Sequence, residues 1–269
     1  MIVAQHYELG ERLGTGGEAH VFRARHLPTG VEVALRLSPS SGADDAPRSL
    51  RPIPEPHPGW ARLLDRGIDE SHGAYTVFEL LRGETLGAMV ARGPLAVDAW
   101  HLFVRQSLDA VEALHRAGWV HGDLNADNFL LHEGATWKLL DLPFHDTTPV
   151  EKRSPFFGSI YTMAPEQFGG HAPDIRSDLY ALGCLYYAAA SGIYPHAGGS
   201  EAEIAIGRLR FPPEPLHDLS TNLKPDEAAW VKHLLVINPA NRPADVDAAR
   251  QLLTRTAGPK PLPRPSSSD

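Results

Sequence analysis

The residues with the clearest capacity for chemistry are a carboxylate, an amide and a second carboxylate at fixed spacings. The run H-G-D-L-N-A-D-N over residues 121–128 aligns with the pattern H-R-D-L-x-x-x-N. In that pattern the aspartate accepts the proton of an attacking hydroxyl, and the asparagine binds Mg²⁺ during phosphoryl transfer. Asp123 and Asn128 hold these two positions. Asp141 follows in K-L-L-D-L-P-F, which aligns with the D-F-G motif whose aspartate binds Mg²⁺.

A glycine-rich segment precedes these residues. The run L-G-T-G-G-E-A-H-V over residues 13–21 joins two strand-like segments and aligns with G-x-G-x-x-G-x-V, with Ala19 at the third glycine. Glycines let a backbone approach phosphates closely, so that its N–H groups face the anion. A flexible hairpin explains the glycines equally well, but their order before the other motifs favours a phosphate site. V-A-L-R follows and ends in Arg36, which is otherwise explained as an exposed strand residue.

Three later motifs follow in a fixed order. G-S-I-Y-T-M-A-P-E (158–166) looks like a loop ending in A-P-E, S-D-L-Y-A-L-G (177–183) like the start of the helix after it, and N-P-A-N-R-P (238–243) like the arginine segment that pairs with the A-P-E glutamate. From residue 7 to about 255 the motifs resemble Ser/Thr protein kinases, most of all the bacterial eukaryotic-like ones. Small-molecule kinases of the aminoglycoside and choline type share the His-Gly-Asp pattern but lack these later motifs.

The resemblance implies a nucleotide site that uses ATP with Mg²⁺ or Mn²⁺. Asp123 would be the catalytic base, and Asn128 and Asp141 the catalytic metal ligands. Arg36 takes the place of the lysine that holds the α- and β-phosphates.

The resemblance also implies where the nucleotide lies. Glu79 and Leu81 would offer backbone groups to adenine, beside Phe78 as gatekeeper. Core packing would explain the apolar members of this set equally well. The residues that would enclose adenine or approach the phosphates are Leu13, Gly14, Gly16, Gly17, Val21, Ala34 and Leu130.

Several positions depart from the family pattern. Arg36 and Asn125 replace two lysines that contact phosphates, and Gly122 replaces the arginine before the catalytic aspartate. Leu142-Pro143 replaces Phe-Gly after Asp141. In addition, Pro47 interrupts the segment where the family has its helix αC, and prolines crowd the stretch after it. We therefore expect helix αC to be reduced or missing, without its glutamate.

The elements that position these residues follow from periodicity. Alternation predicts strands at 7–14, 21–24, 31–37, 61–64 and 75–81, with Val31, Val33 and Leu35 on one face. Apolar steps of three and four from Val97 predict a helix that Gly118 ends. Further helices are expected at 201–208, 226–236 and 244–254. The predicted fold is α+β, in one bilobal protein-kinase-like domain over residues 1–257, with a small β-rich N-lobe (1–81) and a larger helical C-lobe (82–257). Residues 258–269, rich in Pro and Ser, are expected to be a disordered tail.

Composition excludes several classes of partner. A net charge of −8 and a pI near 5.9 argue against nucleic acid or an anionic membrane, because both select for basic patches. A single cysteine, Cys184, rules out an intrachain disulfide and fits a reducing compartment. No signal peptide or membrane span is evident, so we expect a cytoplasmic protein.

The sequence therefore predicts an ATP- and Mg²⁺-binding protein kinase fold with impaired catalysis. Such a pseudokinase would act through binding a protein partner or protein substrate. The alternatives are an active Ser/Thr kinase with altered phosphate-binding residues and, more distantly, a small-molecule phosphotransferase.

Overall fold

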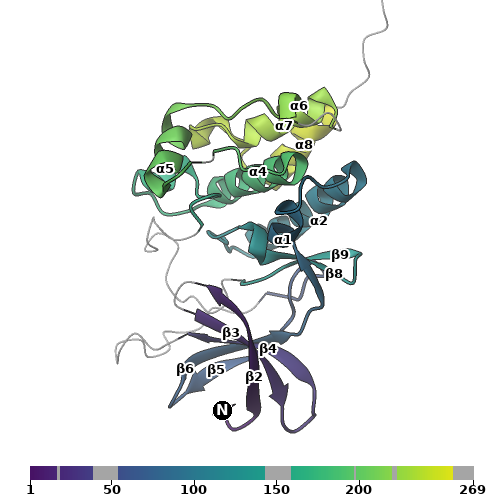
Figure 1. Ribbon diagram of the computed structural model, residues 1–269, viewed down its shortest axis with the longest axis vertical. Coiled ribbons are helices and arrows are strands. Elements are labelled where there is room, and N and C mark those ends of the chain that lie inside the picture. The colour runs from purple at the N-terminus through teal and green to yellow at the C-terminus, as the bar shows by residue number, and fades with distance from the viewer. Residues whose placement is uncertain (17–18, 39–53, 143–158, 197, 220–222, 257–269) are drawn as a thin grey trace, which may run out of the picture.

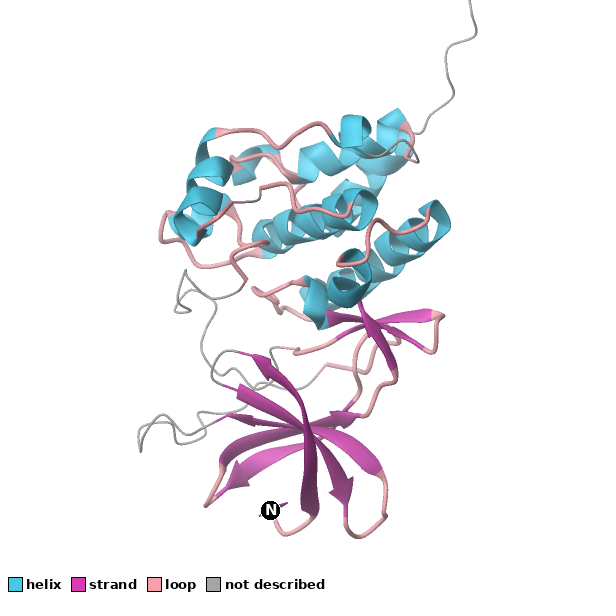
Figure 2. Cartoon of the chain, in the orientation of Figure 1, coloured by secondary structure: helices cyan, strands magenta, loops and turns pink. Residues whose placement is uncertain are grey.

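The computed structural model describes residues 1–16, 19–38, 54–142, 159–196, 198–219 and 223–256. Strands gather at one end of the molecule and helices at the other, with a small sheet between them (Figure 1). Figure 2 shows the same division by secondary structure. The two-lobed α+β arrangement agrees with the prediction from the sequence.

The N-lobe is a sheet of six antiparallel strands in the order β1-β2-β3-β4-β6-β5. Four strands lie within two residues of their predicted bounds, whereas the strand expected at 61–64 begins at Leu63 and runs to Asp69. Val33 and Leu35 are buried on the expected face, but Val31 precedes the strand and is 55% exposed. The strands are β1 (Ile2–Val3), β2 (Tyr7–Gly16), β3 (Ala19–His26), β4 (Glu32–Ser38), β5 (Leu63–Asp69) and β6 (Gly73–Glu79).

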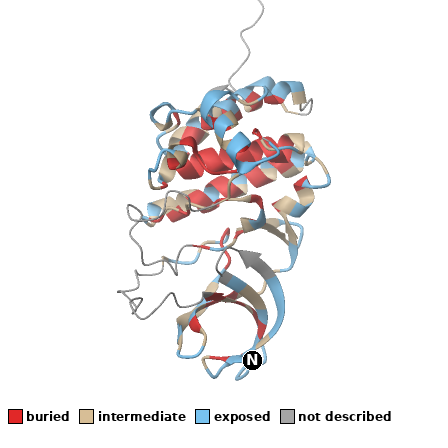
Figure 3. Ribbon diagram, turned by 60° about the vertical axis from the view of Figure 1, so that its left-hand side comes forward, coloured by how far each residue is buried: buried red, intermediate tan, exposed pale blue. Residues whose placement is uncertain are grey.

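Side-chain hydrogen bonds tie the two ends of this sheet together. Asp69 near the β5 end accepts from the Ala4 backbone N–H at 2.7 Å, just after β1. The Tyr7 hydroxyl donates to Asp65 of β5 at 2.8 Å, and Tyr75 reaches the same carboxylate at 3.4 Å. The sheet therefore curls until its outer strands meet (Figure 3). A cluster of buried apolar residues, which includes Val3, Val33 and Val77, forms the core of this lobe.

The segment after β4 bears on the predicted loss of helix αC. Residues 39–53, which include Pro47, lie outside the described residues. The described chain resumes at Pro54 and contains no helix before β5. It instead runs against the C-lobe, where the Trp60 indole N–H donates to the Ala110 carbonyl at 2.9 Å. Residues 258–269 likewise lie outside the described residues, so the expected tail stays a prediction.

A second sheet, β7 (Gly83–Thr85), β8 (Phe129–His132) and β9 (Thr136–Leu139), lies between the lobes. Its last strand pairs with the chain at Trp60 through an isolated bridge to Leu139. Lys138 of β9 adds an ion pair to Glu79 of β6 at 3.4 Å. The end of β9 is thus fixed to both lobes immediately before Asp141.

The C-lobe is built around α4 (Ile175–Ser191), which is buried along most of its length (Figure 3). Asp174 caps its N-terminus, and Gly192 ends it in the left-handed region at φ +80°, where glycine is unstrained. The long helix α2 (Val97–Arg116) packs its apolar stripe against α4 and ends just before Gly118, as predicted. The other helices are α1 (Leu86–Val90), α3 (Pro165–Phe168), α5 (Glu201–Arg210), α6 (Leu216–Leu219), α7 (Pro225–Leu234) and α8 (Val246–Thr256). In the described part of the chain, no helix combines the length and apolarity that a bilayer span requires.

An ion pair deep in the C-lobe joins α3 to the segment before α8. Arg242 donates to both carboxylate oxygens of Glu166, at 2.7 and 2.6 Å, and its side chain is fully buried. Burial alone would raise the pKa of Glu166, but the hydrogen bonds and charge of Arg242 outweigh it, so the pKa is lowered. Glu166 is therefore a carboxylate at neutral pH and neutralises the buried guanidinium.

Glu166→Gln should lower the free energy of unfolding by about 3 kcal/mol at pH 7, because it leaves Arg242 buried without its counter-ion. The pKa is depressed in the folded state, so this stabilisation is present above the ordinary glutamate value of about 4.3 and is lost as pH falls through the folded value. Urea unfolding of both proteins from pH 7 to pH 3 measures the difference, with the exposed Glu70→Gln as control. Two results would contradict the assignment. One is an equal free energy of unfolding for wild type and Glu166→Gln at pH 7, and the other is a difference in this free energy that does not become smaller as the pH falls.

Candidate active site

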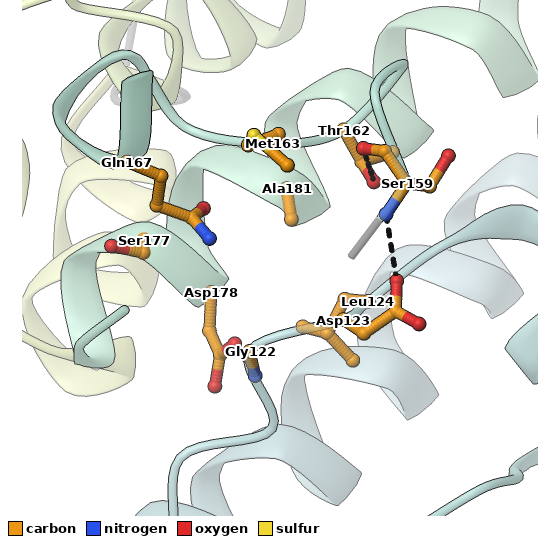
Figure 4. Close-up of a pocket in the computed structure, with 10 residues that line it drawn as sticks. All are labelled: Gly122, Asp123, Leu124, Ser159, Thr162, Met163, Gln167, Ser177, Asp178 and Ala181. Carbon is orange, nitrogen blue, oxygen red and sulfur yellow. Dashed lines mark hydrogen bonds between the residues drawn. The ribbon is translucent and has the colours of Figure 1, made fainter. Parts of the chain in front are cut away.

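The predicted catalytic loop, residues 121–128, is anchored by a buried carboxylate of α4. Asp178 accepts the backbone N–H groups of His121 and Gly122, each at 2.9 Å, and also contacts the His115 imidazole at 2.8 Å. Burial raises the pKa of Asp178, but these hydrogen bonds and the nearby histidines leave it lowered. Figure 4 shows Asp178 directly beside Gly122. A charged carboxylate therefore fixes the start of the loop.

His121 connects the loop to the strand that leads into Asp141. Its Nδ1 accepts the Asp123 backbone N–H at 3.2 Å, and its Nε2 lies 3.3 Å from the Leu140 carbonyl. A carbonyl can only accept, so the neutral Nε2–H tautomer satisfies both contacts. His121 thus acts as a spacer that sets the distance between Asp123 and the chain at Asp141.

Asp123 has the surroundings of a proton acceptor. Its Oδ1 accepts the Ser159 backbone N–H and the Asn125 amide Nδ2–H, both at 3.0 Å (Figure 4). Burial raises the pKa of Asp123, and the hydrogen bonds from Asn125 and the Ser159 backbone offset part of that rise. A buried carboxylate with a raised pKa is a stronger base than an exposed one. The Ser159 backbone N–H, rather than its hydroxyl, makes the contact with Asp123.

Asn125 forms hydrogen bonds within the catalytic loop, whereas the lysine that it replaces contacts a phosphate. Its Oδ1 accepts the backbone N–H groups of Asp127 and Asn128, at 3.0 and 3.1 Å, and so caps the short 3₁₀ helix Ala126–Asn128. Its Nδ2 donates to Asp123. The side chain is therefore committed to the loop rather than extended toward a phosphate. The spacing N-x-D-N is the signal by which the sequence could have shown this cap.

Asn128 and Asp141 are the predicted metal ligands. The Asn128 Nδ2 donates to the Asp123 carbonyl at 2.9 Å, which leaves the amide oxygen as the atom for a cation. Its backbone carbonyl accepts from Leu140 N–H at 2.8 Å, so Asn128 lies beside the chain that carries Asp141. Asp141 has φ +46° and a side chain that is 39% exposed. One carboxylate and one amide oxygen suit Mg²⁺, which takes its remaining ligands from nucleotide phosphates and water.

Arg36 lies against Asp141. The Arg36 Nε is 3.1 Å from the Asp141 Oδ1, and the arginine side chain is only 14% exposed. Because Arg36 belongs to β4 and Asp141 follows β9, the pair joins the two lobes. The structure thus pairs Arg36, the cation predicted to contact the phosphates, with Asp141, a predicted metal ligand.

The other predicted nucleotide residues surround this pair on the strands. Val21 pairs with Arg36 and Gly14 in the sheet, so Gly14, Val21 and Arg36 follow one another across β2, β3 and β4. Ala34 pairs with the buried Phe78, and Leu13 is 44% exposed. Gly16 ends β2, and Leu130 lies in β8, whereas Gly17 lies outside the described residues.

At the hinge the backbone already has partners. The Glu79 N–H donates to the Arg62 carbonyl at 2.9 Å, so this N–H is not available to adenine. The Leu81 N–H forms no hydrogen bond within the residues that the structure describes. The sequence did not predict that the Glu79 side chain pairs with Lys138, which also donates to the Trp60 carbonyl at 3.4 Å. Nothing in the strand pattern links two charges 59 positions apart.

Comparison with known proteins finds a family model that matches most of the chain. Residues 7–256 match the model described as protein kinase domain. The Ser/Thr-protein kinase PknA of Mycobacterium tuberculosis is 32% identical over 251 residues, which cover 88% of this chain and 58% of PknA. PknB of Mycobacterium leprae is 29% identical over 255 residues, which cover 89% of this chain and 41% of PknB. The chain thus spans about two fifths to three fifths of the length of these relatives.

A solved structure resembles the chain at the level of the fold. It is titled as Rad53 residues 1–466 in complex with AMP-PNP, and it superposes with a TM-score of 0.74 at 26% identity. The match covers 91% of this chain and 64% of that one.

The cap made by Asn125 gives a direct test of the loop. Asn125→Ala should lower the free energy of unfolding by about 1–2 kcal/mol, because two backbone N–H groups lose their acceptor. Asn125→Ser keeps a hydroxyl acceptor and should stay within a few tenths of a kcal/mol of wild type. Guanidinium unfolding at pH 7 makes the measurement. Equal stability of the alanine and serine variants would show that the loop does not depend on this side chain.

Proposed function

Because the chain belongs to the protein kinase family, we propose that it binds ATP with Mg²⁺ or Mn²⁺ between β4 and the segment ending at Asp141, and that it transfers phosphate weakly or not at all. The observation that carries the proposal is the contact of Arg36 with Asp141 at 3.1 Å. A bound metal ion would neutralise the phosphates and orient them for transfer. Asn128 and Asp141 would hold the ion, and Arg36 would contact the phosphates.

The contact with Asp141 competes with the role of Arg36 in nucleotide binding. Arg36 would have to contact the phosphates of the nucleotide. Its Nε, however, is paired with the carboxylate of Asp141, which a bound metal ion would also need. Guanidinium is also bulkier than ammonium and donates in a fixed plane, so it reaches a phosphate differently from lysine. Each nucleotide that binds must therefore rearrange or share the Arg36–Asp141 pair.

A second phosphate contact is missing in the catalytic loop. Asn125 is neutral and is used within the loop, so it brings no charge to a transferring phosphoryl group. Removing one such stabilising contact typically lowers a rate by about 10²–10³. Two changes do not add simply, but both act in the direction of slow transfer.

We propose that the chain acts by binding a protein, in the cytoplasm, with nucleotide as the ligand that stabilises the binding form. Support comes from the protein kinase family itself, whose A-P-E segment is intact and held by Arg242. The acidic net charge of −8 also favours a protein over a nucleic acid or an anionic membrane.

An active Ser/Thr protein kinase is the second candidate. Asp123 keeps its hydrogen bond from Ser159 and a raised pKa, as a base requires, and Asn128 stays beside it. The relatives PknA and PknB are named Ser/Thr-protein kinases. On this alternative, Arg36 leaves Asp141 when nucleotide and metal bind.

Two measurements separate the candidates. Thermal shift with millimolar ATP and Mg²⁺ or Mn²⁺ should raise the melting temperature, because ligand binding stabilises the folded state. Transfer of the radiolabelled γ-phosphate should be barely measurable in wild type and unchanged in the exposed control Asp226→Asn. Robust wild-type transfer that Asp123→Asn abolishes would overturn the weak-transfer proposal in favour of an active kinase. The absence of a shift with either ion would overturn nucleotide binding.

A further inference from the structure

Arg208 of α5 is a fully buried cation outside the site described above. Its relative exposure is 0%, although its helix lies on the surface of the C-lobe. The guanidinium donates to three backbone carbonyls of one loop. Those acceptors are Ile160 at 2.7 Å, Tyr161 at 2.9 Å, and Met163.

Within the described residues, no carboxylate forms an ion pair with Arg208, whereas Arg242, on the same Tyr180 ring, has Glu166. Burial and the charge of Arg208 lower the pKa of His196 to about 4, and burial raises the pKa of Cys184 to about 11. Both neighbours are therefore neutral near pH 7. Among the described residues, carbonyl dipoles and the rings of Phe168 and Tyr180 stabilise the cation.

The loop that Arg208 holds is the one that touches Asp123. Residues 159–163 form a tight turn in which the Ser159 carbonyl accepts the N–H groups of Thr162 and Met163, at 3.0 and 2.9 Å. The Ser159 N–H leaves this turn and donates to Asp123 at 3.0 Å. Arg208 therefore donates hydrogen bonds to one side of a turn, and the other side of the turn donates a hydrogen bond to Asp123. Figure 4 shows the Ser159 N–H directed at Asp123, with Thr162 next to Ser159.

Burying an arginine without a counter-ion is strongly unfavourable unless its N–H groups are satisfied. Here the two terminal nitrogens of Arg208 donate to the loop, while its Nε has no hydrogen-bond partner among the described residues. A planar guanidinium, however, can donate in several directions at once, which neither an apolar chain nor a single ammonium does. Arg208 thus fixes three carbonyls of one loop, those of Ile160, Tyr161 and Met163.

We propose that Arg208 is a positioning residue that holds loop 159–163 against Asp123. This role goes beyond the proposed function and does not depend on it. The exposed face of the loop is the Tyr161 ring, 42% exposed and stacked on Tyr194 with centroids 5.1 Å apart. Arg208 sets the position of this ring through the Tyr161 carbonyl.

Hydrogen–deuterium exchange of the whole chain tests the proposal. Arg208→Met should speed exchange of the Ser159, Thr162 and Met163 amides by about tenfold or more, since hydrogen bonds from a charged group are lost. Arg208→Lys keeps the charge without the planar fork and should give a smaller increase. Arg210→Met, an exposed arginine on the same helix, is the matched control and should exchange as wild type does. The α4 and α7 amides should not change in any variant.

Two results would overturn the proposal. One is unchanged exchange at residues 159–163 in a folded Arg208→Met protein, and the other is faster exchange spread evenly over α4 and α7, which marks a general packing role. If Arg208→Met does not fold, Arg208→Gln, which keeps one donor, carries the same comparison. Thermal shift with ATP and Mg²⁺ is recorded in parallel. A wild type without that shift would sink the proposed function, while exchange would still decide the role of Arg208.

Discussion

The contact between Arg36 and Asp141 sets the character of this site, because it brings the N-lobe cation and the C-lobe carboxylate into one ion pair. Phosphoryl transfer depends on placing positive charge around a nucleotide that carries several negative charges. Here Arg36 is shared with the residue that should bind the metal ion, and Asn125 offers no second cation. Asp123, the predicted base, and the amide of Asn128 are nevertheless held in order. We therefore propose a site that is better equipped to bind a nucleotide than to speed its reaction.

Buried charges in the C-lobe explain why the catalytic loop stays ordered. Asp178 fixes the backbone at His121 and Gly122, Arg242 neutralises Glu166, and Arg208 grips the loop that meets Asp123. Gly122 has φ +78°, a left-handed backbone that glycine adopts without strain. Substitution of the family's arginine by glycine thus removes a charge while easing the backbone. Each anchor uses a hydrogen-bonded charge in a dry interior, where such bonds are strong and their loss is costly.

Much of the fold could be predicted because periodicity reports burial. The alternation in β4 and the helical repeat of α2 gave both elements close to their observed bounds. The start of β5 was placed too early, since Ala61 pairs with the Leu139 backbone rather than with a strand of the same sheet. The motifs also placed Asp123 and Asn128 together, because a short loop leaves little freedom between them. The contacts Arg36–Asp141, Lys138–Glu79 and Arg208–Met163 could not be predicted, since they join distant segments whose approach only the folded core determines.

The role of Arg36 is tested most directly by calorimetric titration of ATP, with and without Mg²⁺, into wild type, Arg36→Lys and Arg36→Ala. Loss of the cation should weaken ATP binding without Mg²⁺ by about tenfold, a change of about 1.4 kcal/mol in binding free energy. Arg36→Lys should bind as tightly as wild type or more tightly. Mg²⁺ should improve affinity most in Arg36→Ala, where Asp141 has lost its resident partner. If all three proteins bind ATP alike under both conditions, Arg36 does not serve the nucleotide and this account of the site is wrong.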